Sequence, residues 1–284
     1  MRAIFCGIGL LSLAACGGGG GTTASLSTSG YAEPGSQIFV NYESRPRPFQ
    51  LITSRNNAPD FTTADVSLEV SGTTELTFVV DGVTYVVAVN GSRYEGSNGN
   101  VDARFYPEQL SYDDLEYGWL LLFNTVTGER TAGYVHWGFD TDPNEINALN
   151  GSVTYTGQVR FDAYSSTSGE LGGGSIQLNA DFDTDIINGS MILEDINGVA
   201  DDLGGIPNAT VTINPTMMDG NGFETTITTL ITGPNPNGVT VDPGTLNGTF
   251  FGPNGVRVGG TFAAGAGSTL DPNLVVQGGF IAAQ

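Results

Sequence analysis

The sequence predicts an all-β fold. No apolar pattern keeps a 3.6-residue period, many short stretches alternate with a period of two, and Asn, Asp and Gly separate those stretches. We expect an eight-stranded antiparallel β-barrel in the C-terminal half, preceded by a smaller, irregular β-rich domain.

The barrel strands are the clearest elements. In Ser175–Asp183, Ile176, Leu178, Ala180 and Phe182 share one face and polar side chains share the other. The same alternation predicts strands at Val153–Tyr164, Ser175–Asp183, Met191–Ile196, Ala209–Asn214, Phe223–Ile231, Leu246–Phe251, Val256–Ala263 and Leu274–Ile281. Eight strands with one apolar face can close on themselves and remove exposed edges.

Three Asn-Gly pairs are expected to form turns in this half, because Asn and Gly tolerate a positive φ: Asn188-Gly189, Asn247-Gly248 and Asn254-Gly255. We favour a barrel filled by its own side chains. A membrane-spanning barrel gives the same alternation with the apolar face outward, so alternation alone leaves that reading open.

The first half is β-rich but less regular. Its best hairpin joins Glu75–Val80 to Val83–Val89 through Asp81-Gly82, and a second joins Gly118–Phe123 to Thr131–Phe139. The prolines in 45–48 and 56–60 are expected to interrupt sheet pairing, because proline donates no ladder hydrogen bond. The most turn-like run, 140–145, places a domain boundary shortly after it.

The N-terminus predicts a lipoprotein signal. Arg2 precedes an apolar run, Ala3–Ala15, that is too short to span a bilayer and ends in Leu13-Ala14-Ala15-Cys16. A lipoprotein signal peptidase requires small residues before the cut and a cysteine, acylated for example with palmitate, after it. We therefore expect a signal peptide at 1–15, lipidation of Cys16, a Gly/Ser/Thr-rich linker at 16–30, a β-rich domain at 31–149 and the barrel at 150–284.

Cysteine content and charge narrow the function. Cys6 lies in the predicted signal peptide and Cys16 would be lipidated, so we expect no thiol catalysis, disulfide or cysteine-ligated metal. The net charge is −21, with 30 acidic residues, and all 9 basic residues are arginine. Such a chain repels phosphate backbones, so no nucleic-acid partner is expected. A charged partner, if there is one, is expected to be basic or cationic, but we favour the simpler explanation that the acidity keeps the protein soluble.

No catalytic or metal site is assigned. His136, the single histidine, lies in an apparent strand, and no serine elbow motif accompanies it. Asp181, Asp183 and Asp185, and the run 140–145, resemble calcium loops only partly. We therefore expect no catalysis, no metal and no cofactor.

Five aromatic residues gather near the expected domain junction: Tyr112, Tyr117, Trp119, Tyr134 and Trp137. Large rings of this kind are common in recognition surfaces and in packing between subdomains, and we favour packing. The ligand-binding residues are therefore left unknown.

The run from Gly248 to Phe262, GTFFGPNGVRVGGTF, resembles a signature of the transferrin-binding protein B family, in which a Gly-x-Phe-Tyr-Gly-Pro-Asn-Ala segment leads into a strand with Gly-Gly-x-Phe. Phe251 stands for the tyrosine and Gly255 for the alanine. Val153–Gly157, Ala180–Phe182 with Asn188–Ser190, and Gln277–Phe280 follow in the family's order, so the resemblance covers about residues 150 to 284. Factor H-binding protein-type lipoproteins are related.

The resemblance implies a lipid-anchored, surface-displayed barrel that follows a smaller handle domain and binds a ligand without catalysis. The chain has one handle and one barrel where transferrin-binding protein B has two of each. We expect a monomer, anchored by lipid in the outer membrane at the cell surface, whose partners are a host or environmental protein, a haem protein or another nutrient, and a TonB-dependent receptor. A structural or adhesive envelope lipoprotein is the alternative.

Overall fold

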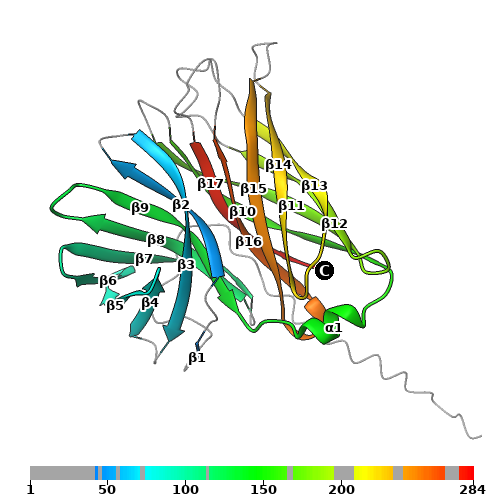
Figure 1. Ribbon diagram of the computed structural model, residues 1–284, viewed down its shortest axis with the longest axis horizontal. Helices are drawn as coiled ribbons and strands as arrows, with labels where there is room; N and C mark the ends of the chain where they lie inside the picture. The colour runs from blue at the N-terminus through cyan, green and yellow to red at the C-terminus, as the bar shows by residue number, and fades with distance from the viewer. Residues whose placement is uncertain are drawn as a thin grey trace, which may run out of the picture.

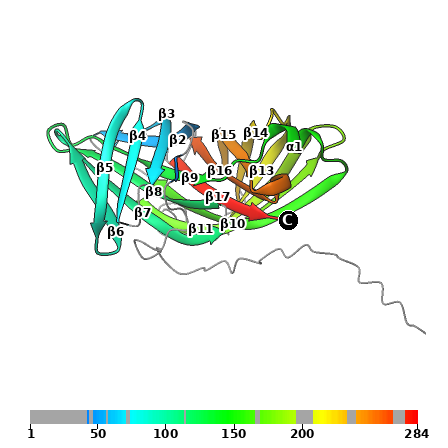
Figure 2. The same ribbon diagram turned by 90° about the horizontal axis from the view of Figure 1, so that it is seen from below.

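The computed structural model describes residues 42–43, 47–55, 58–70, 74–112, 115–164, 169–194, 208–232, 239–265 and 275–284. Nearly all of them lie in two antiparallel sheets that stand side by side (Figure 1 and Figure 2). The first sheet, hereafter the handle, precedes a closed eight-stranded barrel in the chain. The predicted fold class is confirmed. No helix among the described residues is long and apolar enough to cross a membrane.

The handle sheet contains nine strands in the order β1-β3-β2-β9-β8-β7-β6-β5-β4. They are β1 (Tyr42–Glu43), β2 (Arg47–Arg55), β3 (Ala58–Val70), β4 (Glu75–Val80), β5 (Val83–Asn90), β6 (Arg93–Asn98), β7 (Val101–Tyr112), β8 (Leu115–Asn124) and β9 (Arg130–Gly138). Both predicted hairpins are present, as β4–β5 and β8–β9.

The handle is more regular than the prolines suggested, because β3 also pairs with β4 and returns the sheet on itself. Pro48 pairs with Asp65, and Pro59 pairs with Ser54, so neither interrupts the β2–β3 ladder. Here β2 and β3 are paired mainly with each other: β9 joins β2 only at Ile52–Ser54, and β4 joins β3 only from Val66 onward. A strand paired on one side can accommodate proline, because the missing donor can face its open side.

The barrel closes in chain order through β10 (Ser152–Tyr164), β11 (Gly169–Asp181), β12 (Ile186–Glu194), β13 (Asn208–Met217), β14 (Gly222–Thr232), β15 (Val239–Phe251), β16 (Arg257–Gly265) and β17 (Val275–Ala283). These are the eight predicted strands. Their apolar face points into the barrel, where Tyr155, Leu178, Met191 and Phe250 belong to one buried cluster. The alternation is therefore that of a barrel filled by its own side chains.

Two of the three expected Asn-Gly turns are wrong. Asn188-Gly189 lies within β12 and Asn247-Gly248 within β15, whereas Asn254-Gly255 does form a turn, with φ of 56° and 63°. Gly189 and Gly248 instead provide space in the sheet: an added Cβ would lie 2.1 Å from the carbonyl oxygen of Gln177 and 2.2 Å from Cζ of Phe223, respectively.

The glycine pairs of the signature interlock β16 with β17. Gly260 lies opposite Phe280, and Phe262 lies opposite Gly278. An added Cβ on Gly260 would lie 2.4 Å from Cζ of Phe280, and one on Gly278 would lie 2.5 Å from Cζ of Phe262. Each glycine therefore leaves room for the ring from the neighbouring strand, which explains the spacing Gly-Gly-x-Phe.

A short connection closes one end of the barrel. Helix α1 (Pro143–Asn147) begins at Asp142, whose side chain accepts a hydrogen bond from the Asn144 amide, and its Ile146 joins the barrel core. The 3₁₀ turn η1 (Pro253–Gly255) packs beside it, and the Asn254 amide donates to Glu145 Oε2 at 2.9 Å. The run 140–145, expected to be a turn, thus contains the start of a helix.

Candidate functional site

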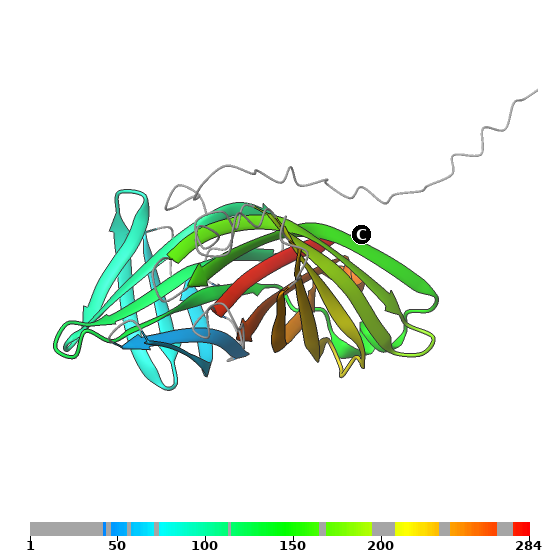
Figure 3. The same cartoon turned by 90° about the horizontal axis from the view of Figure 1, so that it is seen from above.

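The handle and barrel meet in a close seam along β16 and β17. Residues of β16 and β17 are buried on both strand faces almost throughout, whereas other barrel strands alternate between buried and exposed. Figure 1 and Figure 3 show β17, in red, running along the junction. The seam is an apolar cluster from both sheets: Leu115, Tyr117, Tyr134, Phe251 and Ile281.

Glycines let the two backbones approach in this seam. An added Cβ on Gly259 would lie 3.0 Å from Leu115 Cδ1, and one on Gly279 would lie 2.8 Å from Tyr134 Cβ. In each signature pair, one glycine therefore faces a phenylalanine of the next barrel strand and the other faces the handle.

The buried side chain of Asp162 forms hydrogen bonds at the edge of the seam. Asp162 of β10 is 1% exposed, and its Oδ2 accepts a hydrogen bond from the Trp119 indole at 2.6 Å. The Gln277 amide lies 3.4 Å from the same oxygen and donates to the Ala132 carbonyl at 3.1 Å. Hydrogen bonds among these three polar groups on β10, β8 and β17 thus hold the handle against the barrel, as expected for buried polar groups.

His136 lies at the other side of the seam. It is 7% exposed and sits edge-on to two rings, Phe49 of β2 at 5.0 Å and Phe251 of β15 at 5.6 Å between centroids. Its surroundings are those of a packed side chain between the sheets. This arrangement agrees with the strand histidine that the sequence indicated.

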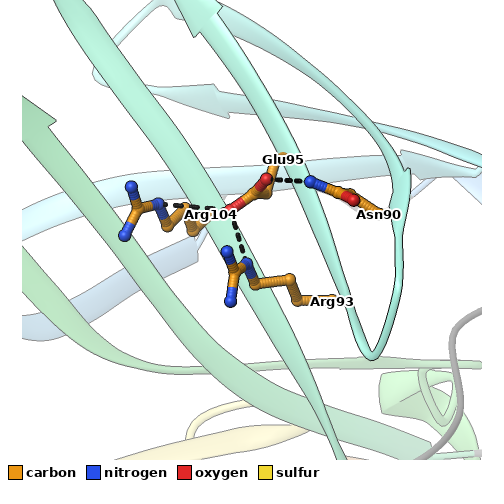
Figure 4. A network of polar contacts seen from close by, with 4 residues as sticks. All are labelled: Asn90, Arg93, Glu95 and Arg104. Atoms are coloured by element: carbon orange, nitrogen blue, oxygen red, sulfur yellow. Dashed lines mark hydrogen bonds and ion pairs between the residues drawn. The ribbon is translucent and has the colours of Figure 1, made fainter.

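A second polar cluster lies on the outward face of the handle, away from its core (Figure 4). Glu95 accepts hydrogen bonds from Asn90 and Arg93, and its Oε1 lies 3.5 Å from Arg104 Nε. Burial alone would raise the pKa of Glu95, but these hydrogen bonds and the two arginine charges outweigh it and lower the pKa. The hydrogen bond to Glu95 in turn raises the pKa of Arg93.

Aromatic rings of β7 and β8 continue this cluster toward Arg130 of β9. The Arg93 guanidinium lies 5.8 Å from the Tyr106 ring centre, and Tyr106 lies 5.5 Å from Trp119. Further along the same face, Arg130 lies 5.5 Å from the Phe123 ring. We call this surface the Arg–aromatic face and define it by Arg93, Arg104, Tyr106, Trp119, Phe123 and Arg130. A shallow depression of about 270 Å³ borders it, between Glu95–Ser97 and Asp102–Arg104.

The predicted lipidation residue, Cys16, lies outside the described residues, as do the linker and signal peptide. Of the five aromatic residues, Tyr117 and Tyr134 lie in the seam, Trp137 in the handle core and Trp119 at the seam edge; the Tyr112 side chain is not described. Asp181, Asp183 and Asp185 surround the β11–β12 turn, where Asp181 and Asp183 accept backbone hydrogen bonds. Within the described ranges, no three Asp, Glu, His or Cys side chains gather to hold a metal.

Sequence reasoning missed Arg93, Glu95, Arg104 and Tyr106, and it missed Asp162 and Gln277 as the lock of the seam. The first four lie on two strands, β6 and β7, and become neighbours only through the register between them. No sequence signal distinguishes Asp162 and Gln277 from other outward polar residues, because they are buried only through the packing of the two sheets in the fold.

Residues 148–284 match a family model described as the C-lobe and N-lobe β-barrels of transferrin-binding protein B. No curated protein matches the chain. Among solved structures, a double mutant of transferrin-binding protein B from Haemophilus parasuis Hp5 has a TM-score of 0.52 at 16% identity, covering 84% of this chain and 45% of that one. Intact Ap-TbpB, with its N and C lobes, gives 0.50 at 16% identity, covering 84% and 46%.

At this identity the structural likeness concerns the fold, and the chain spans less than half the length of these two proteins. The matched segment begins within the helix-bearing connection and includes every strand of the barrel. The signature from Gly248 to Phe262 lies in β15, η1 and β16, where its glycines shape the barrel and the seam. Residues 148–284 therefore form a transferrin-binding protein B-like barrel domain.

Proposed function

We propose that this protein is a surface lipoprotein that binds a ligand through one handle–barrel unit and performs no catalysis. The observation that supports this most is the fold: one handle and one barrel with the topology of transferrin-binding protein B, joined by a buried seam. Such a unit presents its outward faces and loops to a partner without domain movement.

The proposed organisation follows the sequence: signal peptide at 1–15, acylated Cys16 and linker at 16–30, handle at 31–149 and barrel at 150–284. Each buried methylene of an acyl chain contributes about 0.8 kcal/mol to membrane partitioning, so two or three chains on Cys16 would anchor the protein stably. The proposed location is the outer membrane, with the unit displayed at the cell surface as a monomer. A TonB-dependent receptor is the proposed uptake partner.

The relatives are named for binding transferrin, and we propose only the broader class here: a host or environmental protein, a haem protein or another nutrient carrier. A structural or adhesive role in the envelope is the alternative. Its distinguishing expectation is a partner within the cell's own envelope and no link to nutrient uptake.

The anchor is tested with the full chain expressed in a diderm host and labelled with a palmitate analogue. Acylation should require Cys16 and disappear in Cys16→Ser, whereas Cys6→Ser should be acylated normally. Protease added to intact cells should then degrade the wild-type protein. Absence of label, or full protection from protease, would overturn the surface-lipoprotein proposal.

The ligand class is tested by pull-down with the full chain in detergent, across transferrins, haem proteins and the organism's own envelope extract. A saturable complex with a nutrient-carrying protein supports uptake. Binding confined to envelope components, without any nutrient carrier, would favour the structural alternative instead.

A further inference from the structure

We infer that the Arg–aromatic face of the handle is a docking surface for an acidic segment of a protein partner. The inference rests on the proposed binding function and assigns that function a surface. The face comprises outward side chains of β6, β7, β8 and β9, namely Arg93, Arg104, Tyr106, Trp119, Phe123 and Arg130.

Charge on the handle is distributed unevenly. All three handle arginines whose side chains are described, Arg93, Arg104 and Arg130, lie on this face. Its acidic residues are Glu95 and Asp102, whereas Asp65, Glu69, Glu75 and Asp81 are exposed around β3 and β4. In a chain with a net charge of −21, the described part of the handle therefore carries a face with three arginines against two carboxylates. An acidic partner would meet repulsion elsewhere and attraction here.

The arginines are partly exposed but held in place. The side chains of Arg93 and Arg104 are 38% and 39% exposed, and both are oriented by Glu95, which is 24% exposed. Arg93 also lies over Tyr106, and Arg130 lies over Phe123. Preorganised guanidinium groups lose little entropy when they bind carboxylates in a bidentate manner, so this arrangement favours carboxylate recognition.

The shape favours a protein segment over a small anion. Four neighbouring strands extend roughly 14 Å across the face, given a spacing of about 4.8 Å between strands. Tyr, Trp and Arg are the residues that most often dominate the binding energy of protein interfaces. The depression beside Arg104 gives the face relief, and Trp119 connects it to the barrel through Asp162.

The test uses the full chain in detergent micelles and a phage library of random twelve-residue peptides. The selected peptides should be enriched in Asp and Glu and should contain aromatic or aliphatic residues beside them. A synthetic copy of the strongest peptide should lose about tenfold or more in affinity for the triple variant R93Q/R104Q/R130Q, and its binding should weaken with added salt.

The matched control is T63E/S67E/T77E, which changes the net charge by the same three units on β3 and β4 and should keep the peptide affinity within about twofold. The triple variant R93K/R104K/R130K keeps the charge but loses the planar fork, so its affinity should be intermediate. Circular dichroism and thermal melting of each variant verify that the fold is retained.

Peptides without acidic enrichment, or equal affinity for wild type and R93Q/R104Q/R130Q, would overturn the inference. Heparin measured in parallel tests an anionic polysaccharide, and tighter binding of heparin than of the peptide at the same face would also overturn it. If this test fails while Cys16-dependent acylation and ligand capture succeed, only the assigned surface is wrong and the proposed function stands.

Discussion

Tyr155 connects the barrel core with the last residue of the chain. Its hydroxyl donates to the Gly255 carbonyl at 2.7 Å, and the Gln284 side chain lies 3.3 Å from the same oxygen. Burial raises the pKa of Tyr155 to about 12, while the hydrogen bond from Gln284 lowers it slightly. The folded state therefore holds Tyr155 neutral at a pH where an unfolded tyrosine ionises.

This predicts a loss of stability in alkali. The contribution of Tyr155 is fully present below about pH 10 and decreases as the pH rises to about 12, by about 2–3 kcal/mol in total. Urea unfolding of wild type and Tyr155→Phe between pH 8 and pH 11.5 checks it. The stability difference between the two proteins should shrink or reverse with rising pH, and parallel curves would contradict the assignment.

Mutation of Asp162 can distinguish a stabilising hydrogen bond at the seam from simple side-chain packing. Asp162→Ala would leave the Trp119 indole without its acceptor and the Gln277 amide with the Ala132 carbonyl alone, at a cost of about 1–3 kcal/mol, because a buried unsatisfied donor costs about that much. Trp119→Phe alone should cost less, and the double variant should cost clearly less than the sum of the two. Additive losses in urea denaturation would show that the two groups do not interact.

At the level of the strand, the glycines of the signature pack against rings. Gly260→Ala would bring a Cβ within 2.4 Å of the Phe280 ring and 2.1 Å of the Asn247 carbonyl oxygen. Because a backbone atom is among the contacts, the strain cannot be relieved by side-chain movement alone, and we expect a loss of about 2 kcal/mol or more.

Thermal unfolding of Gly260→Ala measures that loss. Gly173→Ala is the control, since its Cβ would meet mainly the end of the flexible Arg160 side chain, at 2.5 Å from Nη1. It should change the melting temperature little. Equal effects of the two substitutions would mean that the ring contact has no special importance in the barrel.

The strands of the barrel could be predicted because each buries one face, and burial imposes a period of two on the residues. Two of the Asn-Gly pairs were wrongly predicted to be turns, because glycine occurs both in turns with a positive φ and in strands where a neighbouring side chain or backbone comes close. Gly248 serves the second purpose, opposite Phe223. Within one strand, sequence does not reveal which use applies, because the ring that requires the space belongs to another strand.

The candidate surfaces were harder to predict for the same reason. Arg93, Arg104 and Arg130 are ordinary outward residues in their own strands, and only the register of β6 to β9 brings them together with Tyr106, Trp119 and Phe123. The seam was foreseen only as an aromatic junction. The hydrogen bonds of Asp162 and Gln277 in the seam were not predicted, because both residues take positions that would face solvent if the handle did not cover their strands.

At the level of the whole molecule, the seam should make handle and barrel unfold together. The outward faces of β16 and β17 are buried in the fold. Separating the two sheets would therefore expose Tyr134, Phe251 and Ile281 to water. Burying large side chains of this kind stabilises by roughly 1.5–3 kcal/mol each. The contact between the two sheets therefore contributes a stabilising free energy comparable with the total stability of a small domain.

Gly279→Leu tests this coupling. Its Cβ would lie 2.8 Å from Tyr134 Cβ and would force the handle away from β17 while leaving the barrel interior unchanged. Calorimetry should show one transition for the wild-type chain and two for Gly279→Leu, whereas Gly173→Leu, on the outward face of β11, should keep one. A single transition in Gly279→Leu at a merely lower temperature would mean that the seam adds stability without determining cooperativity. Two transitions in the wild type would show that handle and barrel are independent from the start.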